Sequence, residues 1–473
     1  AIGYNALLVN TTGASNVAVG SNALDAATTG SNNTSIGHES LTDLTTGSQN
    51  TAIGSNALAN TTTAANNVGV GFLALTANTT GTGNTGIGYE AGNAVTTGNH
   101  NTFLGLSTGR GVTTEDDNVF VGSGSGHSSG NGANRTCVGR EAGAYASGSN
   151  NVAIGKKAMH GATDGSSTGG NNVAVGKDSL TNMTTGTDSV AVGTSTLKTN
   201  TTGGNNVAVG NQALEANTTG YGNVAIGSIV LDANTTGIQN TAVGYNTLSD
   251  ATTAANNTAV GINAGQNITT GYSNVCIGEA AGNNGTTIIG TTCVGTHAGH
   301  DLTTGGENLL LGNSAGRSNS PSGQLTTQQH NVVLGDNNVA NLFCADTSIS
   351  SSDSRDKTDV TNFTIGLAWI EALRPVTYRW DRRTWYGSGV EGAEDEFFGT
   401  PDGSKKRDRL HLGFLAQEAL EVEKTNGYGS SNDDSLLVNL TADGMSYGMK
   451  YERLVPILVN AIKELSTRVT ALE

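Results

Sequence analysis

The chain has 473 residues, of which 68 are glycine, while aromatic residues make up 5% and charged residues 13%. This composition lies far from globular averages and argues against a conventional compact enzyme built around one large core. The formal net charge of −16 argues against binding of nucleic acid or anionic membrane by charge alone, and no run of about 18 apolar residues predicts membrane insertion.

A short repeat fills most of the chain. From Gly3 to Gly335, an aliphatic residue precedes glycine twenty times in the same local frame, and most successive glycines are 17 residues apart. Self-similarity at a fixed short period is typical of proteins whose units bury their apolar edges by stacking on their neighbours. We therefore predict that residues 1–343 form an all-β repeat, a β-solenoid or β-roll, that acts as a long, stiff arm. Because Ala1–Gly3 completes a repeat already in register, we expect more fibre or an attachment module upstream.

The centre of each unit reads N-[V/T]-A-[V/I]-G, as in Asn206–Gly210. Alternate residues of a strand share a face. The residue directly before glycine is always Val, Ile or Leu, so we predict that it is the core contact within the chain. The small residue before it is then expected to approach a neighbouring chain. Phe103 and Phe120 occupy this small-residue position in adjacent units, which predicts a local aromatic rung.

The second half of each unit contains an Ala-Leu pair, such as Ala23–Leu24, and then a polar turn that commonly reads Thr-Thr-Gly. We predict two short strands and two turns per coil. Asn stands four residues before glycine in nearly every unit, with Arg135, Ser189 and Thr291 as exceptions. These side chains are expected to bond along the axis, to favour turns, or both. Since a 17-residue coil has little interior, we expect neighbouring chains to complete it, with three-fold association preferred.

Cysteines and insertions mark departures from the repeat. Cys137, Cys276 and Cys293 take the small-residue position, so we predict small buried thiols, whereas Cys344 lies beyond the last repeat. Extra residues interrupt the period at 161–167 and again at 317–330. Insertions in a solenoid emerge as surface loops, and these two are either tolerated excursions or receptor-contacting loops.

Composition changes abruptly after Phe343, and all three tryptophans lie beyond it. We predict a linker over 344–351 and then a small α+β domain over 352–473. Its expected elements are a helix over 365–372, a strand over 376–380, a charged loop over 391–409 and a helix over 451–473. The last helix carries a heptad seam typical of a coiled coil, although an amphipathic helix packed on its own domain is the alternative. The seam consists of Val455, Leu458, Ile462, Leu465, Val469 and Leu472.

Two resemblances follow from these patterns. The repeats over 1–335 resemble the head repeats of trimeric autotransporter adhesins, and similar repeats occur in bacteriophage tail fibres. Beyond them, Ser352–Lys357 is similar to the S-D-x-R-x-K entry motif of the intramolecular chaperone auto-processing domain of phage tail spikes and fibres, a self-cleaving Ser-Lys peptidase family. Three further blocks of that family are matched in order, at Ile365–Tyr378, Gly413–Glu418 and Tyr451–Leu465.

The chaperone resemblance implies a domain that trimerises, guides folding of the repeats and then cuts itself off. Carried onto this chain, Ser352 is the nucleophile, Lys357 is the base, and the cleavage site is the bond between Ser351 and Ser352. Arg355 is the neighbouring cation that lowers the pKa of the lysine or positions the segment. Asp356 stands where the family usually has an apolar residue, and its carboxylate favours the ammonium form of Lys357. The alternative is that the serine-rich stretch is only a linker.

Together these patterns predict a homotrimeric tail fibre of a phage virion that attaches to a receptor on the host cell surface, with carbohydrate as one candidate. At most, the chain is an enzyme that cleaves itself once. No cofactor, metal, nucleic acid or membrane is implied. The alternatives are a bacterial trimeric surface adhesin and a polysaccharide-degrading tail spike.

Overall fold

The computed structural model describes residues 1–128, 130, 132–162, 166–339, 360–383, 386, 399–431, 434–440 and 447–472. The chain divides into two compact units, Ala1–Thr291 and Thr292–Glu473. No helix within the described residues is both long and apolar enough to cross a membrane.

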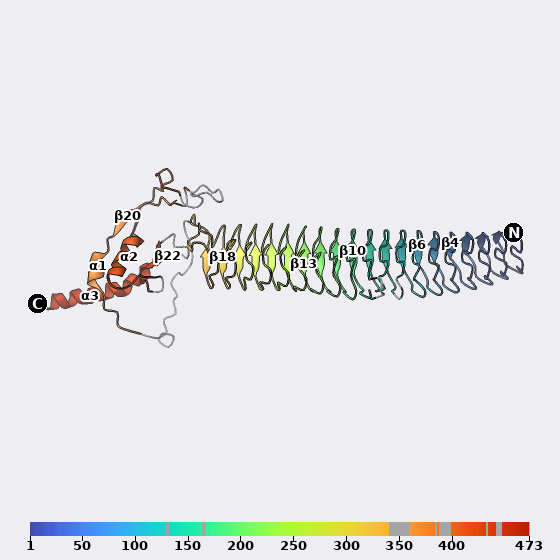
Figure 1. Ribbon diagram of the computed structural model, residues 1–473, viewed down its shortest axis with the longest axis horizontal. Helices are drawn as coiled ribbons and strands as arrows, with labels where there is room; N and C mark the ends of the chain where they lie inside the picture. Colours follow the sequence, from blue (N-terminus) through green and yellow to red (C-terminus); the bar gives the residue numbers. More distant parts are fainter. Residues whose placement is uncertain are drawn as a thin grey trace. The chain divides into compact units, whose positions relative to one another are not determined.

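The first unit is a stack of coils, each with one three-residue strand (Figure 1). Every described pairing is parallel, and most join residues 17 apart, as in Val17 with Thr34. The strands are β1 (Val17–Val19), β2 (Thr34–Ile36), β3 (Thr51–Ile53), β4 (Val68–Val70), β5 (Thr85–Ile87), β6 (Thr102–Leu104), β7 (Val119–Val121), β8 (Thr136–Val138), β9 (Val152–Ile154), β10 (Val173–Val175), β11 (Val190–Val192), β12 (Val207–Val209), β13 (Val224–Ile226), β14 (Thr241–Val243), β15 (Thr258–Val260) and β16 (Val275–Ile277). The predicted parallel β-solenoid with a 17-residue period is confirmed.

The second unit begins with three coils of the same kind, which contain β17 (Thr292–Val294), β18 (Leu309–Leu311) and β19 (Val332–Leu334). A small α+β region follows. Its elements are α1 (Leu367–Ala372), β20 (Val376–Tyr378), β21 (His411–Gly413), α2 (Ala416–Thr425), β22 (Val438–Leu440), β23 (Tyr447–Met449), the 3-10 helix η3 (Tyr451–Arg453) and α3 (Leu454–Thr470). The predicted helix, strand and terminal helix are therefore confirmed, while 344–351, Cys344 and 391–398 lie outside the described residues.

The strand faces are the reverse of the prediction. The middle residue of each strand points into its own coil, as shown by Ala52 with no exposed surface, whereas Ile53 directly before glycine is 38% exposed. The expectation that the Val or Ile before glycine forms the core of its own chain is thus wrong. In most coils the strand side encloses one small side chain per rung, and the large β-branched residues face outward.

Each coil contains one strand rather than the predicted two. The Ala-Leu segment turns instead of extending, because the leucine has left-handed backbone geometry, with φ of 54° at Leu24 and 49° at Leu41. A residue in that region cannot continue a strand. The leucine side chains are nevertheless fully buried and fill the interior opposite the strand. Gly20 is required at the corner, since a Cβ there would lie 2.3 Å from the carbonyl oxygen of Gly37.

Two side chains share the interior of each coil: the mid-strand residue and the residue six positions after it. In most coils one of the two is small and the other is large. Most coils pair a small mid-strand residue with a large one six residues later, as in Ala52 and Leu58. In six coils with a larger mid-strand residue, glycine stands six residues later. These pairs are Phe103–Gly109, Phe120–Gly126, Cys137–Gly143, Cys276–Gly282, Cys293–Gly299 and Leu310–Gly316. A Cβ at Gly109 would lie 2.2 Å from the Phe103 ring, so the exchange is steric. The exceptions are Val333, which is followed by Val339, and two coils with small residues at both positions, Gly86–Gly92 and Ala259–Gly265.

The asparagine ladder along the axis is confirmed. Asn240 donates from Nδ2 to Asn223 Oδ1 at 3.1 Å and to the Ala254 carbonyl at 2.7 Å, and its own Oδ1 accepts from Asn257. Each amide thus joins neighbouring rungs and satisfies a backbone carbonyl inside the coil. The expected aromatic rung is also present, with the Phe103 and Phe120 ring centroids 5.8 Å apart.

The prediction of small buried thiols is confirmed, while the surface-loop prediction for the insertions stays a prediction. Cys137, Cys276 and Cys293 are buried thiols. Both insertions leave the strand register intact, because Val152 still pairs with Val173 across the first and Leu309 with Val332 across the second. Residues 163–165 of the first insertion lie outside the described residues.

Candidate functional site

The terminal helix α3 has two apolar stripes. Leu454, Ile457 and Ala461 are buried and pack toward a small core that includes Trp369 and Leu437. The neighbouring stripe is the predicted heptad seam, and its side chains are between 43% and 88% exposed. The buried stripe shows that the helix packs on its own domain, while the coiled coil through the exposed seam stays a prediction.

Helix α3 also holds the segment that leads into α1. Asn460 donates from Nδ2 to the Phe363 carbonyl at 2.7 Å, and Glu464 Oε2 accepts from the Leu367 backbone N–H at 3.1 Å. The carboxylate satisfies a free N–H at the start of α1, where negative charge is favoured. The Phe363–Leu367 segment lies a few residues downstream of the predicted cleavage motif in the sequence, and α3 fixes its backbone.

A buried carboxylate on α2 holds the segment that leads into β22. Glu423 of α2 has no exposed surface and accepts hydrogen bonds from Ser435 Oγ at 2.9 Å and from the backbone N–H of Val438 at 3.0 Å, with Leu437 N–H as a further donor. Burial lowers the pKa of nearby Lys450, and the positive charge of Arg453 lowers it further. Hydrogen bonds to a carboxylate are among the stronger ones, so Glu423 clamps the 435–438 segment to α2.

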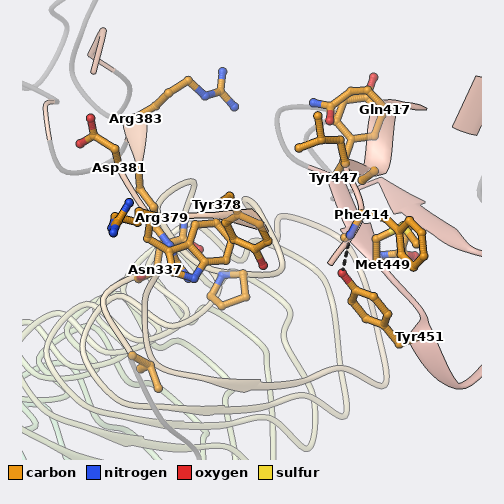
Figure 2. A pocket seen from close by; sticks show the side chains of 18 of the residues that line it. Asn337, Tyr378, Arg379, Asp381, Arg383, Phe414, Gln417, Tyr447, Met449 and Tyr451 are labelled. Carbon is orange, nitrogen blue, oxygen red and sulfur yellow. Dashed lines mark hydrogen bonds between the residues drawn. The ribbon is translucent and has the colours of Figure 1, made fainter. Parts of the chain in front are cut away.

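A cavity of about 1030 Å³ is lined by aromatic and polar side chains of the second unit, including Tyr378, Phe414, Tyr447 and Tyr451 (Figure 2). The Phe414 backbone N–H donates to Tyr451 Oη at 3.1 Å, as the dashed line marks. Burial raises the pKa of Tyr378, with the neighbouring Tyr451 adding to the effect. Among the described residues, the lining of this cavity includes no serine, cysteine, threonine or lysine.

The structure does not describe the predicted catalytic residues. Ser351, Ser352, Arg355 and Lys357 all lie outside the described residues, as does Asp356. The Ser-Lys dyad and the cleavage site therefore stay predictions. Within the described residues, no group of three or more His, Cys, Asp and Glu side chains is placed to hold a metal ion.

The comparison with known families bears on this part of the chain. Residues 352–428 match the family model Peptidase_S74, chaperone of endosialidase. The chain thus carries a C-terminal chaperone domain after its β-solenoid. The match begins at Ser352, the residue from which we predict the domain to start, and it includes α1, β20, β21 and α2. No curated protein matches the chain.

A charged cluster braces the coils that precede the chaperone domain. Asp301 accepts from His300 Nδ1 at 2.7 Å and from Gln324 Nε2 at 3.1 Å, and it lies 3.5 Å from Arg317 Nε. Burial acts to raise the pKa of Asp301, but the His300 hydrogen bond and the Arg317 charge outweigh it and hold the pKa below its usual value. Since Arg317 and Gln324 belong to the second insertion, Asp301 fixes this insertion on its coil.

Sequence reasoning missed several of these residues. Glu423 gave no signal, because a carboxylate in an amphipathic helix is usually solvated. Asn460 and Glu464 project from α3 toward a segment almost a hundred residues away, and such a contact has no local pattern. The outward Val and Ile face did leave a signal, since the residue before glycine is invariably large while the one before it varies from Gly to Phe.

Proposed function

We propose that this chain is a trimeric host-attachment fibre of a phage virion, whose chaperone domain aligns three chains, guides folding of the repeats and is released by cleavage before Ser352. The observation that carries the proposal is the apolar strand face left exposed in coil after coil of an arm joined to a chaperone domain. Ile36, Ile53, Ile87 and Ile277 on this face are each 38% exposed.

The area of the face fits chain association. A three-residue strand is roughly 10 Å long and neighbouring strands lie about 4.8 Å apart, so the sixteen strands of the first unit present a face on the order of 800 Å². Each partner in a standard protein interface contributes about 800 Å². An apolar face of this size and regularity is a binding surface. A second copy of the chain matches it rung for rung, because both have the same period.

The same regularity creates the folding problem that a chaperone domain solves. Two copies displaced by one coil bring nearly identical faces together, so the arm specifies its register weakly. Association of three α3 seams first would fix the chain ends and raise the local concentration of the repeats. After folding, removal of the chaperone domain would make unfolding of the fibre effectively irreversible, so the fibre would be kinetically stable.

The cleavage we propose uses Ser352 as an internal nucleophile. Its Oγ attacks the carbonyl carbon of Ser351, and the peptide C–N bond breaks as the hydroxyl proton passes through Lys357 Nζ to the departing nitrogen. Water then hydrolyses the resulting ester and releases the chaperone domain. Lys357 needs a lowered pKa to take up the proton, and in this scheme Arg355 supplies the neighbouring charge that offsets Asp356.

Mass spectrometry of the purified full-length protein tests the cleavage. We expect two pieces that meet at the bond between Ser351 and Ser352, and an uncut chain in the Ser352→Ala variant. Ser354→Ala, two residues away, is the matched control and should cleave normally. Cleavage at the same bond in Ser352→Ala would remove the dyad assignment.

Light scattering of paired variants tests the interface. Val260 lies on the strand face and Ile262 of the same coil lies just past the glycine; both side chains are exposed. We expect Val260→Asp to lower the yield of folded trimer, because three carboxylates would meet in an apolar contact, while Ile262→Asp should assemble normally. Equal assembly of the two variants would contradict the proposed face. Binding of the labelled trimer to a panel of bacterial cells tests attachment itself.

A further inference from the structure

The cations of the arm are concentrated in one stretch. Residues 1–339 contain only eight Lys and Arg residues, with none before Arg110 and none between Lys198 and Arg317. Four of the eight lie just past the strands of three successive coils, those of β8, β9 and β10. These four are Arg140, Lys156, Lys157 and Lys177. In a chain with a net charge of −16, such a cluster is a distinct electrostatic feature.

The strand register aligns three of these side chains in a row along the axis. Val138, Ile154 and Val175 are paired across β8, β9 and β10, and each cation stands two residues beyond one of them. Arg140, Lys156 and Lys177 thus occupy equivalent positions on neighbouring rungs, about 4.8 Å apart along the axis. All three are exposed. We name these three residues the basic row.

The basic row is only partly neutralised. Glu141 Oε1 lies 3.1 Å from Arg140 Nε and its Oε2 lies 3.6 Å from Lys157 Nζ, while Lys177 Nζ lies 3.6 Å from Asp178. Lys156, at the centre of the row, has no ion pair among the described residues. Like charges on neighbouring strands repel each other, so this alignment is an electrostatic cost that an anionic ligand would relieve.

Polar rings flank the basic row. His160 Nε2 lies 4.0 Å from Glu141 Oε2, and the His160 ring centroid lies 4.9 Å from that of Tyr145. The Tyr145 ring in turn lies 6.5 Å from His127. These half-buried rings offer hydroxyl and imidazole groups beside the cations, which suits a ligand that carries hydroxyls as well as charge.

The basic row is compatible with the trimer proposed above. Three-fold symmetry brings three copies of each interface residue to the same level, so an interface through this row would gather like charges. Such juxtaposition costs several kcal/mol in protein interfaces. The row also lies beyond the strand, past the glycine corner, and not on the Val and Ile face. It is therefore free to face the solvent in the assembled fibre.

We propose that the basic row binds an acidic polysaccharide of the host surface, with its charged groups paired to Arg140, Lys156 and Lys177 along the fibre axis. The inference rests on the attachment role proposed above and specifies its ligand class. A polysaccharide with one charge per sugar suits cations on successive rungs. Duplex DNA carries one charge per roughly 1.7 Å and would extend past the row onto an otherwise acidic arm.

Affinity measurements on the full-length trimer test the inference, with polygalacturonate as the acidic probe, dextran as the neutral one and single-stranded DNA as the competing polyanion. We expect polygalacturonate to bind and the Lys156→Gln/Lys177→Gln variant to bind it at least about fivefold more weakly, because two charge contacts are lost. Lys198→Gln is the matched control: Lys198 lies outside the row, 3.4 Å from Glu215, and should not affect affinity.

Three results would overturn the inference: unchanged affinity in the double variant, equal binding of dextran, or tighter binding of DNA than of polygalacturonate. Circular dichroism of both variants should match the unaltered protein, since surface substitutions seldom disturb a fold. Failure of the attachment role itself would appear separately, as a fibre that binds polygalacturonate but does not bind host cells.

Discussion

The exchange of volume between Phe103 and Gly109 leads to a sharp prediction about the solenoid interior. In Gly109→Ala, the new Cβ would lie 2.2 Å from two carbons of the Phe103 ring, and the residue would keep a left-handed φ of 62°. The Phe103 ring cannot move aside, because it has no exposed surface and packs against Phe120 of the next rung. We therefore expect Gly109→Ala to be strongly destabilising for so small a change.

The expected loss of stability in Gly109→Ala has two parts. Left-handed geometry costs an L-residue about 1–2 kcal/mol, and overpacking a filled interior costs about 1–3 kcal/mol more. Gly124→Ala is the matched control for the first part, because Gly124 has a φ of 65° but a Cβ there would meet only a side-chain carbon of Glu141, at an ordinary contact distance of 3.7 Å. The difference between the two variants therefore measures the steric part alone.

Guanidinium unfolding followed by circular dichroism is a suitable assay, with the midpoints compared at constant m. We expect Gly109→Ala to lose about 1–3 kcal/mol more than Gly124→Ala. Adding Phe103→Ala should remove the steric part of the cost of Gly109→Ala and leave only the part due to left-handed geometry, about 1–2 kcal/mol, although the large cavity lowers the stability of the Phe103→Ala background. Equal midpoints for the two glycine variants, or no coupling to Phe103, would refute the proposed conservation of interior volume.

Three further predictions concern titration and the asparagine ladder. Burial raises the pKa of the Cys137 thiol to about 12, so iodoacetamide at pH 8 should leave it unmodified in the folded protein and modify it after denaturation. Asn240→Ala should cost about 1–3 kcal/mol, because it leaves buried rung partners unbonded, while the exposed Asn211→Ala should change stability by less than about 0.5 kcal/mol; thermal unfolding compares them. The pKa of Asp301 is lower in the folded state than in the unfolded state, so its contribution to stability is present above the unfolded pKa and is lost as the pH falls through the folded pKa. The unfolding midpoint of the unaltered protein should therefore fall more steeply below about pH 4 than that of Asp301→Asn; parallel pH profiles would count against this assignment.

Much of the fold was predictable because its signals are local and repeated. The 17-residue period, the asparagine ladder and the buried cysteines follow from positions that recur in every coil. The heptad seam of α3 and the helix over 365–372 follow from apolar spacing within one element. In the chaperone domain, the three ordered blocks between Ser352 and Glu418 fall within the family match, and several motifs in sequence are more specific than any one alone; the fourth block, Tyr451–Leu465, lies beyond the matched residues.

The orientation of the strand could not be read from the same pattern. Alternation shows that Ala52 and Ile53 face opposite sides, but it does not say which side is inside. A large aliphatic residue is usually buried, and that general preference gave the wrong answer here. The contacts of Glu423, Asn460 and Glu464 were equally invisible, because each joins segments that are distant in sequence.

Periodicity alone determined that this chain builds a stack of coils, because a repeated sequence repeats its local geometry. Only the tertiary structure decided which side chains the coil could enclose. The leucine at the left-handed turn and the mid-strand residue compete for one narrow interior, and their combined volume leaves no room for Val or Ile. Those residues therefore lie outside, on the face that we propose another chain covers.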